Sequence, residues 1–236
     1  MQGNVLIVGA GPTGLVLALW LTKMGVPVRI LSKASGPGTA SRALAVHART
    51  IELYDQMDLA SAVVSGGHQV GGINVWVNGQ KQVRVSLTEV GEGLTRYPFL
   101  HVYPQDAHEK LLVSRLEAMG VSVEWNTALI DFEETVDGIR AQLLLPDGRT
   151  VTADAAYIAG CDGASSVVRK VLDIGFPGGT YAQTFYVADV EASGPPMNGD
   201  LNIALDDEDL VAVFPLDGGN RARLVGTVDE TPTDAA

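Results

Sequence analysis

The feature that most constrains this chain is its N-terminal segment, residues 5–14, which reads Val-Leu-Ile-Val-Gly-Ala-Gly-Pro-Thr-Gly. Four β-favouring residues lead into a Gly-x-Gly-x-x-Gly turn, and an apolar, helix-like stretch follows, which is the context of a dinucleotide site. The first glycine permits the tight turn, the second lets the backbone approach a pyrophosphate, and the third lets the helix pack closely on the strand. Free N–H groups at the helix start favour phosphate, whereas an ordinary βα turn would have no such role. We therefore predict nucleotide contacts at Gly9, Gly11, Pro12, Thr13 and Gly14.

Charge and cysteine content restrict the class of protein. The 236 residues are 46% hydrophobic and carry a formal net charge of −12, which disfavours nucleic acid and anionic membranes as partners. The single cysteine, Cys161, excludes an internal disulfide framework and favours a reducing, cytoplasmic location. The apolar stretch 5–21 is too short and too interrupted to span a bilayer. No metal site is expected, because the four histidines lack ligand spacing: His47, His68, His101 and His108.

Hydrophobic periodicity predicts an α/β fold with a Rossmann-like parallel sheet, an antiparallel excursion from it, and a second, mostly antiparallel sheet. Asn78-Gly79 marks a hairpin within 73–87, and Pro146-Asp147-Gly148 marks another turn. The predicted helices are 15–24, 46–57 and 105–119. The predicted strands are 5–8, 26–31, 99–103, 121–125, 128–134, 139–145, 150–153, 156–160, 185–191, 201–205, 210–214 and 221–228, besides the hairpin.

Three further segments carry a family resemblance. They are residues 41–53 (Ser-Arg-Ala-Leu-Ala-Val-His-Ala-Arg-Thr-Ile-Glu-Leu), 102–105 (Val-Tyr-Pro-Gln) and 157–169 (Tyr-Ile-Ala-Gly-Cys-Asp-Gly-Ala-Ser-Ser-Val-Val-Arg). Together with the glycine turn, they resemble the FAD-dependent aromatic hydroxylases, the flavin monooxygenases built like para-hydroxybenzoate hydroxylase and phenol hydroxylase. The resemblance implies an FAD-binding domain over residues 1–70 and 98–175, and an incomplete substrate-binding β-sheet domain over 71–97 and 176–236.

The resemblance also implies cofactor contacts. Arg42 would lie along the FAD, where a guanidinium can fork onto phosphate oxygens. Gln105 would bring an amide to the ribityl or pyrophosphate region, and Asp162 would serve the FAD from the Asp-Gly motif. Local chemistry gives each of the three residues a simpler role. Arg42 would be a solvated loop arginine, Gln105 would begin a helix after Pro104, and Asp162 would form a turn before a helix capped by a serine.

Two departures from the family pattern stand out. Ser32 occupies the position after the second strand where the fingerprint expects Glu or Asp for the ribose hydroxyls, so adenosine binding should be weaker or shared with Lys33 and Arg42. Ser32 and Lys33 would alternatively suit the 2′-phosphate of NADP. The family's later Gly-Asp motif, followed by histidine and proline, does not occur, so we expect a fragment or a shortened homologue.

The resemblance implies the reaction. NAD(P)H reduces the flavin, O2 forms a C4a-hydroperoxide, and oxygen is transferred to a phenolic or polyketide-like aromatic, so no catalytic side chain is assigned. An apolar substrate wall is predicted on the late strands, from Phe185, Tyr186, Phe214 and Pro215. Two other functions stay open at this point: an NADP-dependent or other two-dinucleotide oxidoreductase, and a non-catalytic flavin-binding module.

Overall fold

A computed structural model describes residues 3–39, 43–88, 91–179, 183–206, 209–217 and 219–228. The chain forms two compact units, each built from two separated segments: Met1–Ser41 with Gln105–Pro177, and Arg42–Pro104 with Gly178–Ala236. Segments 42–70 and 98–104, which the sequence assigned to the FAD-binding domain, cluster with the second unit by their contacts. The domain boundaries stay a prediction, because a compact unit need not coincide with a cofactor-binding domain.

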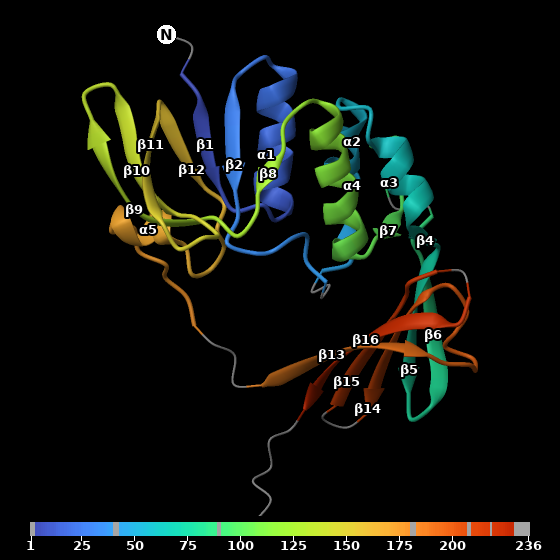
Figure 1. Cartoon of the computed structure of the whole chain (residues 1–236). Coiled ribbons are helices and arrows are strands. Elements are labelled where there is room, and N and C mark those ends of the chain that lie inside the picture. Colours follow the sequence, from blue (N-terminus) through green and yellow to red (C-terminus); the bar gives the residue numbers. More distant parts are fainter. Residues whose placement is uncertain are drawn as a thin grey trace, which may run out of the picture. The chain divides into compact units, whose positions relative to one another are not determined.

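The first unit is built on a four-stranded parallel sheet in the order β12-β1-β2-β8 (Figure 1). Helices α1 and α4 pack against each other, and α1 also contacts β1 and β2. This is the predicted βαβ core, and β1 lies between two parallel neighbours. The elements of this unit are β1 (Val5–Val8), α1 (Pro12–Lys23), β2 (Val28–Leu31), α4 (Gln105–Ala118), β8 (Val123–Glu124), β9 (Ala128–Thr135), β10 (Gly138–Leu144), β11 (Thr150–Ala155), β12 (Tyr157–Gly160) and α5 (Val167–Val171).

A second, antiparallel sheet, β11-β10-β9, packs on the parallel sheet. Leu6 and Val8 of β1 contribute to one buried cluster with Leu129 and Phe132 of β9 and with Val168 of α5. Successive strand residues point to opposite faces, so Ile7, which is also buried, points away from this cluster. The parallel sheet is therefore covered on both faces, as its almost continuously apolar strands predict.

The second unit contains a six-stranded sheet in the order β13-β16-β15-β14-β5-β6 and a three-stranded sheet β3-β7-β4. The hairpin β5–β6 joins the late strands through a parallel pairing of β5 with β14, and the sheet is otherwise antiparallel. Its elements are β3 (Ala45–Val46), α2 (Ala48–Asp55), α3 (Ala60–Gly66), β4 (His68–Val70), β5 (Gly72–Val77), β6 (Gln80–Ser86), β7 (Leu100–Val102), β13 (Thr184–Glu191), β14 (Leu201–Asp206), β15 (Asp209–Pro215) and β16 (Arg221–Val228).

Two local details differ from the sequence prediction. The helix predicted over 46–57 starts only at Ala48. Val46 belongs to β3, where it pairs with His101 of β7, and His47 keeps an extended backbone. Helix α3 and strand β4 were not predicted at all. Both are short, and periodicity over so few residues distinguishes poorly between helix, strand and loop.

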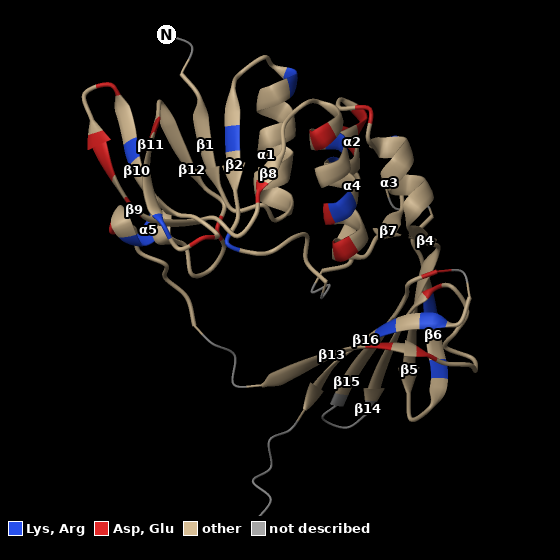
Figure 2. Cartoon of the chain, in the orientation of Figure 1, with Lys and Arg blue, Asp and Glu red and all other residues tan. Residues whose placement is uncertain are grey.

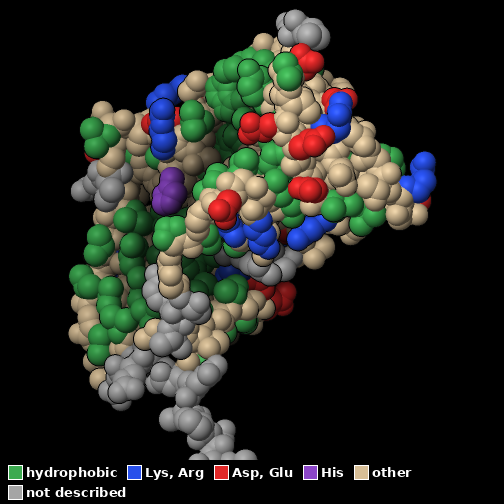
Figure 3. All heavy atoms as spheres, turned by 90° about the vertical axis from the view of Figure 1, so that its left-hand side faces the viewer, with side chains coloured by type: hydrophobic (Ala, Val, Ile, Leu, Met, Phe, Trp, Pro, Cys, Tyr) green, Lys and Arg blue, Asp and Glu red, His purple; other side chains and the backbone are tan. Residues whose placement is uncertain are grey.

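The surface carries mixed charge, and acidic and basic residues are interspersed over the elements of each unit (Figure 2). Hydrophobic side chains reach the surface of the molecule on the face shown in Figure 3. In the six-stranded sheet, Phe185 and Val187 of β13 are 52% and 49% exposed. Among the described residues, no helix has the length and apolarity needed to cross a membrane.

Candidate functional site

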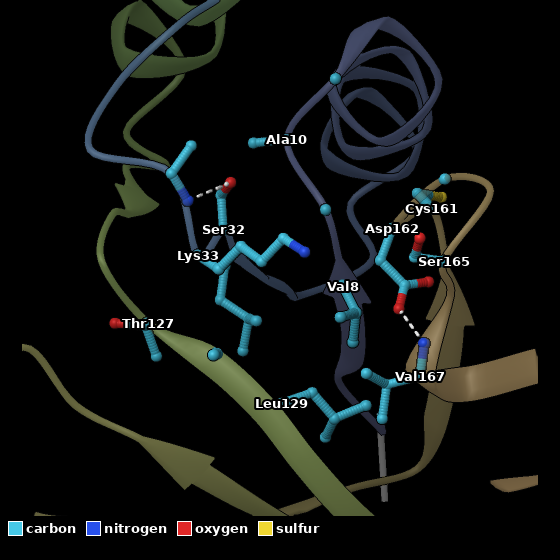
Figure 4. Close-up of a pocket in the computed structure, with 16 residues that line it drawn as sticks. Val8, Ala10, Ser32, Lys33, Thr127, Leu129, Cys161, Asp162, Ser165 and Val167 are labelled. Atoms are coloured by element: carbon cyan, nitrogen blue, oxygen red, sulfur yellow. Dashed lines mark hydrogen bonds between the residues drawn. The ribbon is translucent and has the colours of Figure 1, made fainter. Parts of the chain in front are cut away.

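A pocket of about 260 Å³ opens in the first unit at the carboxyl ends of β1, β2 and β12 (Figure 4). Ligands in open α/β sheets bind at this edge, where the turns that follow parallel strands converge. The pocket is lined by Val8, Gly9, Ala10, Gly11, Leu31, Ser32, Lys33, Ala34, Thr127, Ala128, Leu129, Cys161, Asp162, Gly163, Ser165 and Val167. Four segments that are distant in sequence therefore meet there, and three of them contain a residue predicted for nucleotide binding.

The turn between β1 and α1 has the geometry that its glycines predict. Gly9 adopts a φ of +106°, and a Cβ there would collide with the carbonyl group of Cys161. A Cβ on Gly14 would collide with the carbonyl oxygen of Gly9, so this glycine allows α1 to lie close to the turn. Only glycine fits these two positions without a backbone shift.

Gly11 differs from the other two glycines. It caps α1 with an extended backbone, and a Cβ built on it meets no atom within 4 Å because it would point into open space. Pro12, Thr13 and Gly14 form the first turn of α1, and no acidic residue lies in that turn. A backbone bare of side chains at a helix N-terminus fits a pyrophosphate in both shape and sign of charge.

Ser32 and Lys33 form the wall that follows β2. Ser32 is 9% exposed, and its backbone N–H donates to the carbonyl of Glu124 in β8. Its Oγ accepts a hydrogen bond from the backbone N–H of Ala34 at 3.2 Å. The Lys33 side chain extends from the end of β2 toward the segment that joins β1 to α1 (Figure 4).

Asp162 forms the opposite wall, and its carboxylate is committed to helix α5. It accepts hydrogen bonds from Ser166 Oγ at 2.5 Å and from the backbone N–H of Val167 at 2.6 Å. Ser166 is the N-cap, and its Oγ accepts from the backbone N–H of Arg169. Asp162 therefore lines the pocket and also holds the N-terminus of α5, for which the sequence predicted a serine cap after the turn at Asp162.

Sequence reasoning missed part of the pocket wall. Thr127, Ala128 and Leu129 line it from the segment that follows β8, and their position after a parallel strand is the one signal that would have indicated them. Cys161 also lines the pocket, and burial, reinforced by the charge of Asp162, raises the pKa of its thiol. Such a thiol is a weaker nucleophile than an ordinary cysteine at neutral pH.

Four predicted cofactor residues are not among those that line the pocket: Pro12, Thr13, Gly14 and Gln105. Gln105 begins α4 and does not line the pocket; its side-chain amide donates to Glu109 at 2.8 Å. The same buried carboxylate accepts the backbone N–H of Gly38 at 2.7 Å, which ties the loop after β2 to α4. Arg42 lies outside the described residues.

The four predicted substrate residues divide between the two faces of the six-stranded sheet. Strand register pairs Phe214 with Arg223 and Arg223 with Asp189, which places Phe214 on the same face as Phe185. Pro215 and Tyr186 point to the other face, where the Tyr186 ring lies against Gly226. Phe214 packs beside a buried cluster that includes Leu201 and Val102, whereas Pro215 is itself buried. A ligand on one face would therefore contact at most one of the two pairs.

Comparison with known proteins identifies the family. Residues 2–235 match the family described as "FAD binding domain". The chain is 41% identical over 187 residues to 6-methylpretetramide 4-monooxygenase of Streptomyces rimosus, covering 79% of this chain and 33% of that protein. Its fold is similar to p-nitrophenol 4-monooxygenase PnpA of Pseudomonas putida DLL-E4, with a TM-score of 0.88, 25% identity, and coverage of 98% of this chain and 58% of the other. It is also similar to aklavinone-11 hydroxylase, solved with FAD and aklavinone, with a TM-score of 0.82, 26% identity, and coverage of 99% and 47%.

The chain spans less than two thirds of each of these relatives. Within that span, the glycine turn, the bare N-terminus of α1 and the wall from Cys161 to Val167 form a site that fits the adenosine and pyrophosphate parts of FAD. The structural match extends over both compact units, not only over the glycine motif. The chain belongs to the FAD binding domain family of the flavin-dependent aromatic monooxygenases.

Proposed function

We propose that the protein of which this chain forms part or all is an FAD-dependent monooxygenase that hydroxylates a phenolic or polyketide-like aromatic compound, with NAD(P)H as reductant and O2 as co-substrate. The observation that carries the proposal is the pocket at the glycine turn, in a chain whose residues 2–235 match an FAD binding domain. Named relatives support the substrate class, since they include 6-methylpretetramide 4-monooxygenase and pentachlorophenol 4-monooxygenase. Its one cysteine supports a cytoplasmic location.

In this proposal the chain's residues bind and orient the cofactor. Gly9 and Gly14 hold the turn against α1, and Gly11, Pro12 and Thr13 leave the helix N-terminus open to the pyrophosphate. Ser32 and Lys33 contact the adenosine ribose, and Asp162 fixes the wall beside α5. Gln105 would have to exchange its hydrogen bond with Glu109 to reach the cofactor, and Arg42 is proposed for the phosphates from its sequence alone.

The six-stranded sheet supplies the substrate wall. FAD, when bound, supplies the redox chemistry, and the protein contributes position, exclusion of water and an apolar surface for the ring. We propose the face that carries Phe185 and Phe214, because Val187 and Ile203 share it and the side chains of Phe185 and Val187 are about half exposed. The same face carries the ion pair between Arg223 and Asp189. Tyr186 and Pro215 then pack on the opposite face of the sheet and do not contact the substrate.

A visible absorption spectrum of the purified chain tests the proposal. Addition of FAD should give flavin bands at roughly 375 and 450 nm that remain with the protein on gel filtration. A protein that stays colourless at saturating FAD would contradict FAD binding. If the bands appear, phenols and polyketide aromatics are screened for stimulation of NAD(P)H oxidation, and hydroxylated product is identified by mass spectrometry. Flavin binding without product from the full-length protein would leave FAD binding intact and remove the proposed hydroxylation.

A further inference from the structure

The wall of the pocket that follows β2 has an unusual charge for a site of this kind. In the dinucleotide fingerprint, an acidic residue at the end of the second strand hydrogen-bonds the ribose hydroxyls. Here that position is Ser32, and the next residue is Lys33. Among the residues that line the pocket, Lys33 is the single base and Asp162 the single acid.

Ser32 and Lys33 form one corner of the pocket, and the hydroxyl of the first and the ammonium of the second can still bind a ligand. The Ser32 hydroxyl accepts a hydrogen bond from Ala34, and no acceptor for its proton is found within the described part of the chain. Lys33 is exposed and forms no ion pair with any described carboxylate. A hydroxyl donor beside an unpaired ammonium is a set that binds a phosphate monoester.

The neighbouring carboxylates are already committed. Glu124, on the strand beside Ser32, accepts hydrogen bonds from Nε and Nη2 of Arg29 at 2.6 and 2.8 Å. Asp162 is held by Ser166 and Val167 on the opposite wall. The repulsion with which a fingerprint acid would exclude a second phosphate from the ribose is therefore absent from the corner.

We propose that this corner, in the pocket to which we have assigned FAD, also accepts a 2′-phosphate on the adenosine ribose. Ser32 donates to one phosphate oxygen and Lys33 supplies the positive charge. Adenine nucleotides that carry a 2′-phosphate, NADP(H) among them, then bind the same pocket as FAD and compete with it. The inference rests on the proposed function for the location of the pocket, and on Ser32 and Lys33 for its specificity.

Isothermal titration calorimetry with two mononucleotides tests this inference without flavin. Adenosine 2′,5′-bisphosphate carries the extra phosphate, and adenosine 5′-monophosphate is its matched control. We expect the bisphosphate to bind the purified chain about tenfold more tightly, and to displace FAD at correspondingly lower concentration. Equal affinities, tighter binding of the monophosphate, or no binding of either would overturn the inference.

Three variants assign the effect to the corner. Lys33→Gln should abolish the preference for the bisphosphate, and Ser32→Glu should reverse it while strengthening FAD binding through a charge-assisted bond to the ribose. Lys23→Gln removes the same charge at the opposite end of α1 and should keep the preference. A preference that survives both corner variants would contradict the role of this corner.

The calorimetric result and the flavin spectrum have separate meanings. A chain that binds FAD but does not distinguish the mononucleotides keeps the proposed function and loses this inference. A chain that prefers the bisphosphate and ignores FAD keeps the 2′-phosphate corner and loses the proposed function.

Discussion

At the scale of single residues, the three glycines of the N-terminal turn have different tasks, and the structure separates them. Gly11→Ala should fold normally, because its backbone is extended and the new methyl group meets no atom within 4 Å. That methyl group would point into the space proposed for the pyrophosphate, so FAD affinity should fall about tenfold. Gly14→Ala forces a methyl group onto the Gly9 carbonyl and should lower the free energy of unfolding by about 1–3 kcal/mol.

Urea unfolding and FAD titration of both variants check this division, with Gly36→Ala as the control. Gly36 lies in the loop after β2, and a Cβ there also meets no atom within 4 Å. Its substitution should change neither quantity. If Gly11→Ala lost stability and kept FAD affinity, the turn would be structural only.

His101, a fully buried histidine of the second unit, should make the stability of the protein depend on pH. Its Nε2 donates to the carbonyl of Val63 at 2.8 Å, which leaves Nδ1 without a hydrogen-bond partner among the described residues. Burial lowers the pKa of His101 below its usual 6.5, so the unfolded chain binds more protons than the folded one as the pH falls. The contribution of neutral His101 to the free energy of unfolding is complete above about pH 6.5. It is lost progressively as the pH falls toward the lowered pKa of His101 in the folded state.

The free energy of unfolding, measured in urea between about pH 7.5 and pH 5.5, should therefore decline toward acid. The decline should be smaller in His101→Asn, which cannot titrate, although this variant is less stable at every pH. His47→Gln, at an exposed position, should keep the wild-type decline. Parallel curves for wild type and His101→Asn would show that His101 takes up protons equally in the folded and unfolded states, so that folding does not lower its pKa.

At the scale of elements, α5 depends on its N-terminal hydrogen bonds, because a helix of five residues has little stability of its own. Ser166→Ala removes the acceptor of the Arg169 N–H and the donor to Asp162, so unfolding should become easier by about 1 kcal/mol. Ser165→Ala is the control, since Ser165 is exposed and makes no side-chain hydrogen bond within the described residues. Urea unfolding measures both variants, and equal losses would mean that the cap contributes nothing specific.

Elements with local signals were predictable from the sequence. Asn78 and Gly79 adopt φ values of 51° and 70°, as the hairpin turn requires, and the strand–turn–helix at residues 5–23 appears where its glycines indicated. The parallel pairing of β14 with β5 was not predictable, because strand periodicity specifies faces but not distant partners. For the same reason, the sequence could not place Phe185 and Tyr186 relative to Phe214. The lining residues that belong to a sequence motif, such as Gly9, Gly11 and Asp162, were predicted as site residues. The place of residues 127–129 in the lining and the hydrogen bond between Gln105 and Glu109 depend on tertiary packing, which the sequence does not show.

At the scale of the whole molecule, every residue that lines the pocket belongs to the first compact unit. Its two segments are separated in sequence by residues 42–104, which belong to the second unit. A ligand with adenosine and pyrophosphate but no flavin should therefore stabilise the first unit selectively, since binding to the folded form shifts its opening equilibria. ADP is such a ligand. Because 100-fold excess over the dissociation constant provides about 2.7 kcal/mol of stabilisation, amides that exchange by opening of the pocket should slow by about two orders of magnitude.

Hydrogen exchange measured by mass spectrometry, with and without saturating ADP, gives the readout. Protection should appear in peptides that cover the turn from Val8 to Gly11, the segment after β2, and residues 161–167, all of which meet in the pocket. Peptides from β13 to β16 should exchange unchanged, because no residue of those strands lines it. Equal protection of the two units would mean that they open as one cooperative body, and that the pocket is energetically coupled to the sheet proposed for the substrate. Protection limited to the first unit with ADP, but extending to the six-stranded sheet with FAD, would assign that coupling to the flavin half of the cofactor.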